Sequence, residues 1–177
     1  MRYLLILSLF FLNVLSLSAE GIVLPPGLQA RFLQKITNPQ NKVIQYSGTV
    51  LMDRGNRFKW RYMQPSRKEV CSDGQRVVVV DHDLEQVSLY RMDKGVNLGE
   101  ILKRAKHYKG RLYTAKFQGR TYTLELDEKG RIDQIAYRDD MDNVVNIRLM
   151  KIRALSKAPS TEQMRCPYPK SYDVIGG

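Results

Sequence analysis

Residues 44–62 read IQYSGTVLMDRGNRFKWRY, and apolar side chains alternate with polar ones on both sides of a central turn signal. Successive side chains of a strand point to opposite faces, and an Asp-x-Gly-Asn segment is typical of a tight turn. Two antiparallel strands are therefore predicted, with a shared apolar and aromatic face. The residues of that face are Ile44, Tyr46, Val50, Met52, Phe58, Trp60 and Tyr62.

The same period of two continues along the chain. Further strands are predicted at residues 68–71, 77–80, 86–90, 112–117, 121–126, 131–138 and 144–152. Short turns join most of them, which indicates antiparallel pairing. An open sheet of about nine or more strands has to curl or close.

Two segments are predicted to be helical. Residues 27–36 place apolar side chains, among them Phe32 and Ile36, at four-residue steps. Residues 97–107 show a similar spacing, with Asn97 as the expected N-cap. The predicted fold class is thus mainly β with α: an open, strongly curved antiparallel sheet, or incomplete barrel, covered by a lid of short helices.

The amino-terminal segment is predicted to direct export. Residues 1–19 carry one positive charge at Arg2, an apolar run to Leu17 and small residues up to Ala19. That run is shorter than the roughly 20 residues of a membrane span, so a cleavable signal peptide is expected. The remaining residues 20–177 are expected to form one periplasmic domain, with a carboxy-terminal tail from about 159.

The charge and the two cysteines are interpreted in the light of export. The formal net charge is +11, but the basic residues are scattered, and an exported protein meets little nucleic acid. We therefore expect no nucleic-acid partner. Cys71 and Cys166 can form a disulfide in an oxidising compartment, and the sequence leaves open whether they do.

Catalytic and metal-binding signals are weak. The chain has only two histidines, and it carries no nucleophile with a nearby base in a known motif. The acidic segments at residues 81–83 and 139–143 are interpreted as polar turns. We expect no enzyme activity, no cofactor and no metal. From composition alone, the aromatic strand faces suit either an ordinary core or an apolar ligand cavity.

Several short motifs decide between these alternatives. They are SG at 47–48, RGNRFKW at 54–60, LEQV at 84–87 and PKSYDVI at 169–175. In this order they resemble the LolA-type outer-membrane lipoprotein carriers, with Gly55 in place of a common proline. The resemblance implies a half-barrel that receives triacylated lipoproteins from an inner-membrane ABC-type complex and passes them toward the outer membrane.

The resemblance also implies roles for individual residues. Arg54 corresponds to the arginine that holds the lid shut through backbone carbonyls. The predicted acyl-chain cavity consists of Phe32, Ile36, Tyr46, Val50, Met52, Phe58, Trp60, Tyr62, Ile101, Tyr122 and Leu124. A monomer is expected, and an outer-membrane acceptor is left open. The alternative is a related half-barrel that senses or binds lipid or lipoprotein in the periplasm without transporting it.

Overall fold

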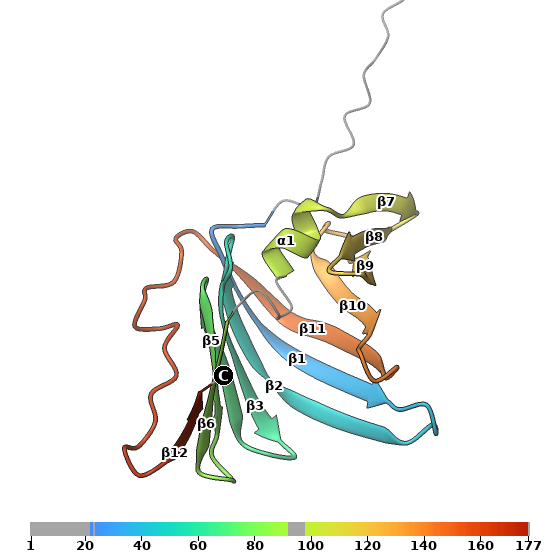
Figure 1. The fold of residues 1–177 in the computed structure, drawn as a ribbon. Helices are drawn as coiled ribbons and strands as arrows, with labels where there is room; N and C mark the ends of the chain where they lie inside the picture. The colour runs from blue at the N-terminus through green and yellow to red at the C-terminus, as the bar shows by residue number, and fades with distance from the viewer. Residues whose placement is uncertain (1–21, 23, 92–97, 177) are drawn as a thin grey trace, which may run out of the picture.

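Twelve strands of one sheet build almost the whole structure, a computed structural model that describes residues 22, 24–91 and 98–176 (Figure 1). The elements are β1 Gly27–Thr37, β2 Val43–Asp53, β3 Arg57–Gln64, β4 Lys68–Asp73, β5 Arg76–Asp81, β6 Gln86–Arg91, α1 Leu98–Lys103, β7 Lys106–Lys109, β8 Leu112–Phe117, β9 Arg120–Leu126, β10 Ile132–Arg138, β11 Val144–Leu155 and β12 Asp173–Gly176.

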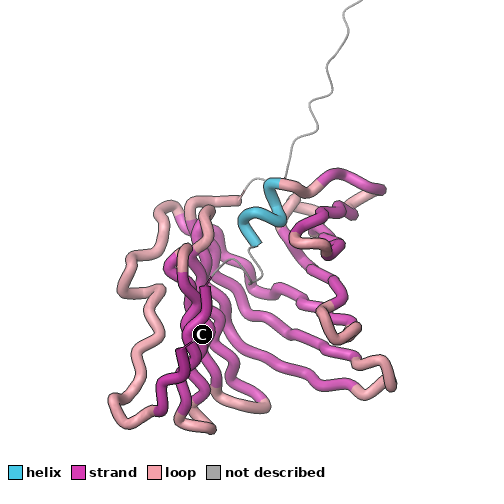
Figure 2. Tube along the Cα trace, in the orientation of Figure 1, coloured by secondary structure: helices cyan, strands magenta, loops and turns pink. Residues whose placement is uncertain are grey.

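The sheet is strongly curved and does not close. Its strand order is β12-β6-β5-β4-β3-β2-β1-β11-β10-β9-β8-β7. All neighbours are antiparallel except β12, which runs parallel to β6. Figure 2 shows the strands bending around an inner face, with the single helix α1 at one end of it. The predicted open, curved antiparallel sheet is confirmed.

The β2–β3 hairpin has the predicted alternation. Val50 lies opposite Trp60, and Met52 lies opposite Phe58. Phe32 of β1 packs edge-on against Trp60 and Tyr62, with ring centroids 4.8 Å and 5.0 Å apart. Such edge contacts suit the quadrupoles of aromatic rings. The hairpin therefore contributes an aromatic floor to the inner face.

The prediction of a helix at residues 27–36 is wrong. This segment is the long strand β1, which pairs with β2 on one side and β11 on the other. Leu28, Phe32 and Ile36 are four residues apart, and a four-residue step returns to the same face in a strand as well as in a helix. Ala30 is buried and Gln29 and Arg31 are exposed between them, which shows the period of two.

The second predicted helix is shorter than expected. The segment 97–107 contains α1 only from Leu98 to Lys103, and β7 begins at Lys106. The expected N-cap Asn97 lies outside the described residues. Ile101 and Leu102 are 0% and 1% exposed because α1 packs onto the inner face. The lid is thus one short helix rather than two.

The sheet has a packed core on each face. The main core joins α1 to the inner face of β1, β2 and β8–β11, and includes Phe32, Val50, Ile101, Tyr122 and Leu124. A smaller core lies on the outer face of β4–β6, where Val80 and Val87 pack with Cys71 and Cys166. Different segments cover the two faces: α1 covers the inner one and the carboxy-terminal tail the outer one.

The tail runs from the end of β11 across the outer face to β6 (Figure 1). A disulfide joins Cys166 of the tail to Cys71 of β4, with Cα atoms 5.8 Å apart. Lys59 Nζ donates to the Arg165 carbonyl oxygen at 2.6 Å. The last residues then pair with β6 as β12. The tail is consequently fastened covalently, by hydrogen bonds and by strand pairing.

Candidate functional site

An apolar hollow of about 260 Å³ lies between the inner face of the sheet and α1. Both halves of the sheet contribute to it, together with α1 and the segment before β1. Its lining consists of Leu24, Gln34, Met52, Asp53, Gly55, Asn56, Arg57, Phe58, Trp60, Tyr62, Val70, Val77, Leu98, Gly99, Ile135, Tyr137 and Ile147. Most of these side chains are aliphatic or aromatic, as expected of a site for an apolar ligand.

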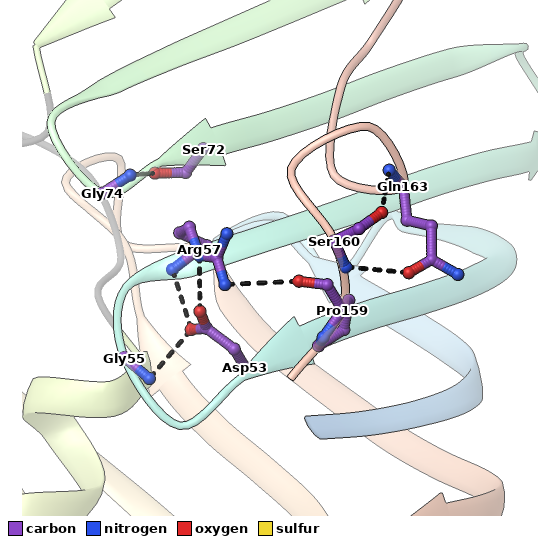
Figure 3. Close-up of polar contacts among 8 residues, drawn as sticks. All are labelled: Asp53, Gly55, Arg57, Ser72, Gly74, Pro159, Ser160 and Gln163. Carbon is purple, nitrogen blue, oxygen red and sulfur yellow. Dashed lines mark hydrogen bonds and ion pairs between the residues drawn. The ribbon is translucent and has the colours of Figure 1, made fainter. Parts of the chain in front are cut away.

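The charged residues of the lining form one ion pair at the β2–β3 turn. Asp53 and Arg57 are the only charged residues among the described residues that line the hollow. Arg57 Nε lies 2.6 Å from Asp53 Oδ2, and the other guanidinium end donates to the Pro159 carbonyl oxygen (Figure 3). Asp53 Oδ1 also accepts from the Gly55 amide at 2.8 Å. Both charges are thus neutralised within the β2–β3 turn.

Uncharged polar groups also line the hollow. Gln34 is 7% exposed, and its Oε1 has no hydrogen-bond partner among the described residues. Burial, with the nearby Tyr137 phenol, raises the pKa of Tyr62 far above its ordinary value. Burial next to Tyr122 raises the pKa of Tyr137 to about 12. Each phenol carries a proton at neutral pH and can donate a hydrogen bond.

Helix α1 packs closely against the β2–β3 turn. A Cβ atom on Gly99 would come within 2.5 Å of the Gly55 carbonyl oxygen and 3.2 Å of Asn56 Oδ1. Only glycine permits this approach without a shift of the backbone. The turn that Asp53 stabilises is thus also the surface on which α1 rests.

Arg54 lies in the same turn, on its exposed side. Its Nε donates to the Leu24 carbonyl oxygen at 3.0 Å, and its amide donates to the Pro26 carbonyl oxygen at 3.3 Å. These carbonyls belong to the segment before β1 rather than to α1. A small crevice beside Arg54 is also lined by Gly99 and Leu102 of the helix. A role of Arg54 as the lid switch stays a prediction.

The predicted cavity residues fall into two groups. Met52, Phe58, Trp60 and Tyr62 line the hollow. The others belong to the packed core around it: Phe32, Val50, Ile101, Tyr122 and Leu124 are fully buried, and Ile36 and Tyr46 are partly buried against them.

Sequence reasoning missed several lining residues, of which Gln34 is the most informative. A helix at residues 27–36 gives no means to judge where Gln34 lies relative to the apolar face. The alternation in β1 puts it on the inner face, opposite Tyr46 of β2 and Ile147 of β11. Alternation in the predicted strand at 131–138 would have indicated Ile135 and Tyr137.

The acidic segments outside the hollow serve as turns. Asp81 Oδ1 accepts from the amides of Asp83 and Leu84, and Asp139 Oδ1 accepts from those of Met141 and Asn143. Within residues 22, 24–91 and 98–176, no group of three or more His, Cys, Asp or Glu side chains could hold a metal ion. None of the described helices is long and apolar enough to cross a bilayer.

Solved structures share this architecture. An uncharacterised conserved protein from Thermus thermophilus superposes with a TM-score of 0.55 at 12% identity, covering 87% of this chain and 92% of that chain. A LolA-superfamily protein from Nitrosomonas europaea gives 0.50 at 11% identity, covering 82% and 93%. The fold is thus that of an open half-barrel that curves around an apolar hollow.

Comparison with known sequences identifies a family within this fold class. The family described as outer membrane lipoprotein carrier protein LolA matches residues 26–101. The outer-membrane lipoprotein carrier protein of Campylobacter jejuni is 30% identical over 141 residues, which cover 80% of this chain and 82% of the relative. That of Helicobacter hepaticus is 26% identical, covering 84% and 83%. The chain belongs to the LolA family of lipoprotein carriers.

Proposed function

We propose that this chain is a periplasmic carrier that binds the acyl chains of lipoproteins released from the inner membrane and delivers them to the outer membrane. The observation that carries the proposal is the apolar hollow beneath a small, non-covalent cover. Membership of a family of carrier proteins supports it. The proposed location depends on the predicted export segment at residues 1–19, which lies outside the described residues.

The hollow has the right chemistry but has to enlarge. Each buried methylene of an acyl chain contributes about 0.8 kcal/mol. The observed volume of about 260 Å³ lies below the roughly 300–1,000 Å³ of typical ligand pockets. Three acyl chains of a triacylated lipoprotein therefore need more room than the described state offers. Opening has to accompany binding, and this lowers the net affinity and favours later release.

Helix α1 is the element whose displacement would supply the room. Ile101 and Leu102 fill the space above the inner face, where Phe32, Tyr122 and Leu124 are packed. If α1 lifts, acyl chains can replace its two apolar side chains against the same floor. Burial of apolar surface is then conserved between the free and loaded states, which keeps the energetic difference between them small.

Arg54 would bias this equilibrium toward the closed state. Its bond to the Leu24 carbonyl holds the segment before β1 beside α1. A guanidinium has several donors in a fixed plane, which suits the bridging of carbonyl groups. The proposed partners are triacylated lipoproteins and an inner-membrane ABC-type releasing complex. We expect the carrier to act as a monomer, with an outer-membrane acceptor as a candidate further partner.

Release of lipoproteins from spheroplasts tests the proposal. The purified mature chain is added to spheroplasts, and soluble lipoprotein bound to it is measured, followed by transfer to outer-membrane vesicles. We expect release at about one lipoprotein per carrier. The variant Arg54→Leu should bind lipoprotein but transfer at most about a tenth as much as the unmodified chain. Without the Arg54 hydrogen bond, the closed state competes less with the loaded state and therefore promotes release less. Arg76→Leu, at an exposed arginine that begins β5, is the matched control.

Two results would contradict the proposal in different ways. Normal transfer by Arg54→Leu would remove the switch role of this residue and leave the carrier role intact. The absence of any released lipoprotein with the unmodified chain would favour the alternative of a half-barrel that senses or binds lipid without transporting it.

A further inference from the structure

The lining of the hollow contains a buried polar side chain whose acceptor has no partner among the described residues. Gln34 projects from the middle of β1 to the inner face, and its Oε1 is buried without a hydrogen bond among the described residues. Leaving such a group unpaired in an apolar environment costs stability, so it needs a compensating role. Leucine at this position would pack in a similar volume at no such cost.

Two phenols accompany Gln34 in the lining. Tyr62 packs against Phe32 and Tyr46, and Tyr137 packs against Tyr122 at a centroid distance of 5.1 Å. Both line the same hollow as Gln34. A carboxamide can accept and donate, and a phenol can donate. The hollow therefore offers an acceptor and donors together, surrounded by apolar side chains.

The lining offers no free charge. Asp53 and Arg57, the two charged residues of the lining that the structure describes, are paired with each other. A carboxylate that entered beside Gln34 would be buried without a counter-ion, which is strongly unfavourable. A neutral carbonyl would instead meet hydrogen-bond donors. A ligand group beside Gln34 would therefore be favoured when it is neutral and disfavoured when it is charged.

We propose that Gln34, with Tyr62 and Tyr137, forms a subsite that recognises the uncharged carbonyl linkage of an esterified or amide-linked acyl chain and rejects free fatty acids. This inference rests on the proposed acyl-chain binding and names its ligand class. The phenol of Tyr62 or Tyr137 donates to the carbonyl oxygen. Gln34 Oε1 accepts from an amide N–H, or its amide group turns to donate to an ester carbonyl.

Binding of three lipids with the same chain tests the subsite. Monolauroylglycerol supplies an ester, N-lauroylethanolamine an amide and laurate at pH 8 a carboxylate. Trp60 is the only tryptophan of the chain and lines the hollow, so its fluorescence reports binding. We expect the unmodified chain to bind both neutral lipids at least about tenfold more tightly than laurate, because the carboxylate of laurate would be buried without a counter-ion.

Two variants locate the discrimination. Gln34→Leu is expected to weaken binding of the neutral lipids by about three- to tenfold and to leave laurate unchanged. Tyr62→Phe keeps the ring contacts and removes a donor, so the same pattern is expected. Gln45→Leu, an exposed glutamine of the neighbouring strand, is the control and should change none of the three. Thermal unfolding should show that Gln34→Leu is at least as stable as the unmodified chain.

Different outcomes identify which linkage is recognised and whether the subsite or the carrier function fails. A greater loss for the amide than for the ester identifies the N-acyl linkage as the group that Gln34 reads, whereas equal losses identify the carbonyl. Equal weakening of all three lipids, no change, or tighter binding of the neutral lipids by Gln34→Leu would overturn the subsite. If spheroplast release succeeds while discrimination is absent, this inference fails and the carrier function stands. If discrimination holds while release fails, the subsite stands and the carrier function fails.

Discussion

The two faces of the sheet are covered in opposite ways. Helix α1 covers the inner face with six residues and is held by the burial of Ile101 and Leu102. The tail covers the outer face and is fastened by a disulfide, by the Lys59 hydrogen bond and by β12. The cover that we propose to move is short and held mainly by packing, whereas the cover on the outer face is cross-linked.

The largest expected effect comes from breaking the outer cover. The disulfide spans a sequence separation of 95 residues, and a cross-link that closes a loop of about 100 residues stabilises by about 4–5 kcal/mol in the chain-entropy account. The double variant Cys71→Ala with Cys166→Ala should therefore lose about this much free energy of unfolding, as measured by denaturant titration. The unmodified chain treated with reductant, which breaks the same disulfide, is the control. An unchanged midpoint would mean that β12 pairing alone fixes the tail.

A smaller effect is expected at the inner cover. Gly99→Ala places a methyl group against the Gly55 carbonyl oxygen, and such overpacking costs about 1–3 kcal/mol. The lost free energy should weaken the packing of α1 against the β2–β3 turn and leave the strand amides protected from hydrogen exchange. Hydrogen exchange of the α1 amides and the rate of lipid uptake, followed by Trp60, should both increase. Gly176→Ala, at an unobstructed position of β12, is the control. Slower uptake would contradict the lid role of α1.

The smallest effect is expected at alkaline pH. The pKa of Tyr137 is raised by burial from 10.0 to about 12, so its protonated form contributes stability that is complete below about pH 10 and is lost as pH rises toward 12. The inner face should loosen in this window while the cross-linked tail stays in place. Trp60 fluorescence should change before the tail becomes sensitive to protease, and Tyr137→Phe should lessen the change. If the tail became sensitive to protease before Trp60 fluorescence changed, the outer cover would be the less stable one at alkaline pH, contrary to this expectation.

Much of the sheet could be predicted because a period of two is decisive where polar and apolar residues alternate closely. The hairpin of β2 and β3 has basic residues at every second position of its second strand, so no helix fits it. In β1 the neighbours of the apolar residues are mixed: Ala30 and Leu33 fall on different faces, and the step from Leu28 to Phe32 is ambiguous. The strands β7 and β12 were not predicted, because each has four exposed residues and so shows no alternation of buried and exposed side chains.

The hollow could be predicted only in part. Alternation in one hairpin predicted the shared face of four of its aromatic and apolar residues, and the family resemblance assigned that face to a cavity. Gln34 was missed because the strand that presents it was assigned to the wrong period. Pairing of Cys71 with Cys166 could not be derived, since sequence separation contains no information on the distance between Cα atoms. The bond from Arg54 to Leu24 depends on where the segment before β1 lies, which local patterns do not determine.

The two outermost strands have a consequence for how such a protein survives at high concentration. A long open sheet presents unpaired backbone groups along both margins, and these margins can recruit other chains into aggregates. Here each margin is a strand of only four residues, β7 and β12. β7 adds Lys106 and Lys109, whose like charges repel a second copy laid alongside. Short margins, and on β7 the lysine charges, thus limit the length over which another chain could pair with the open sheet.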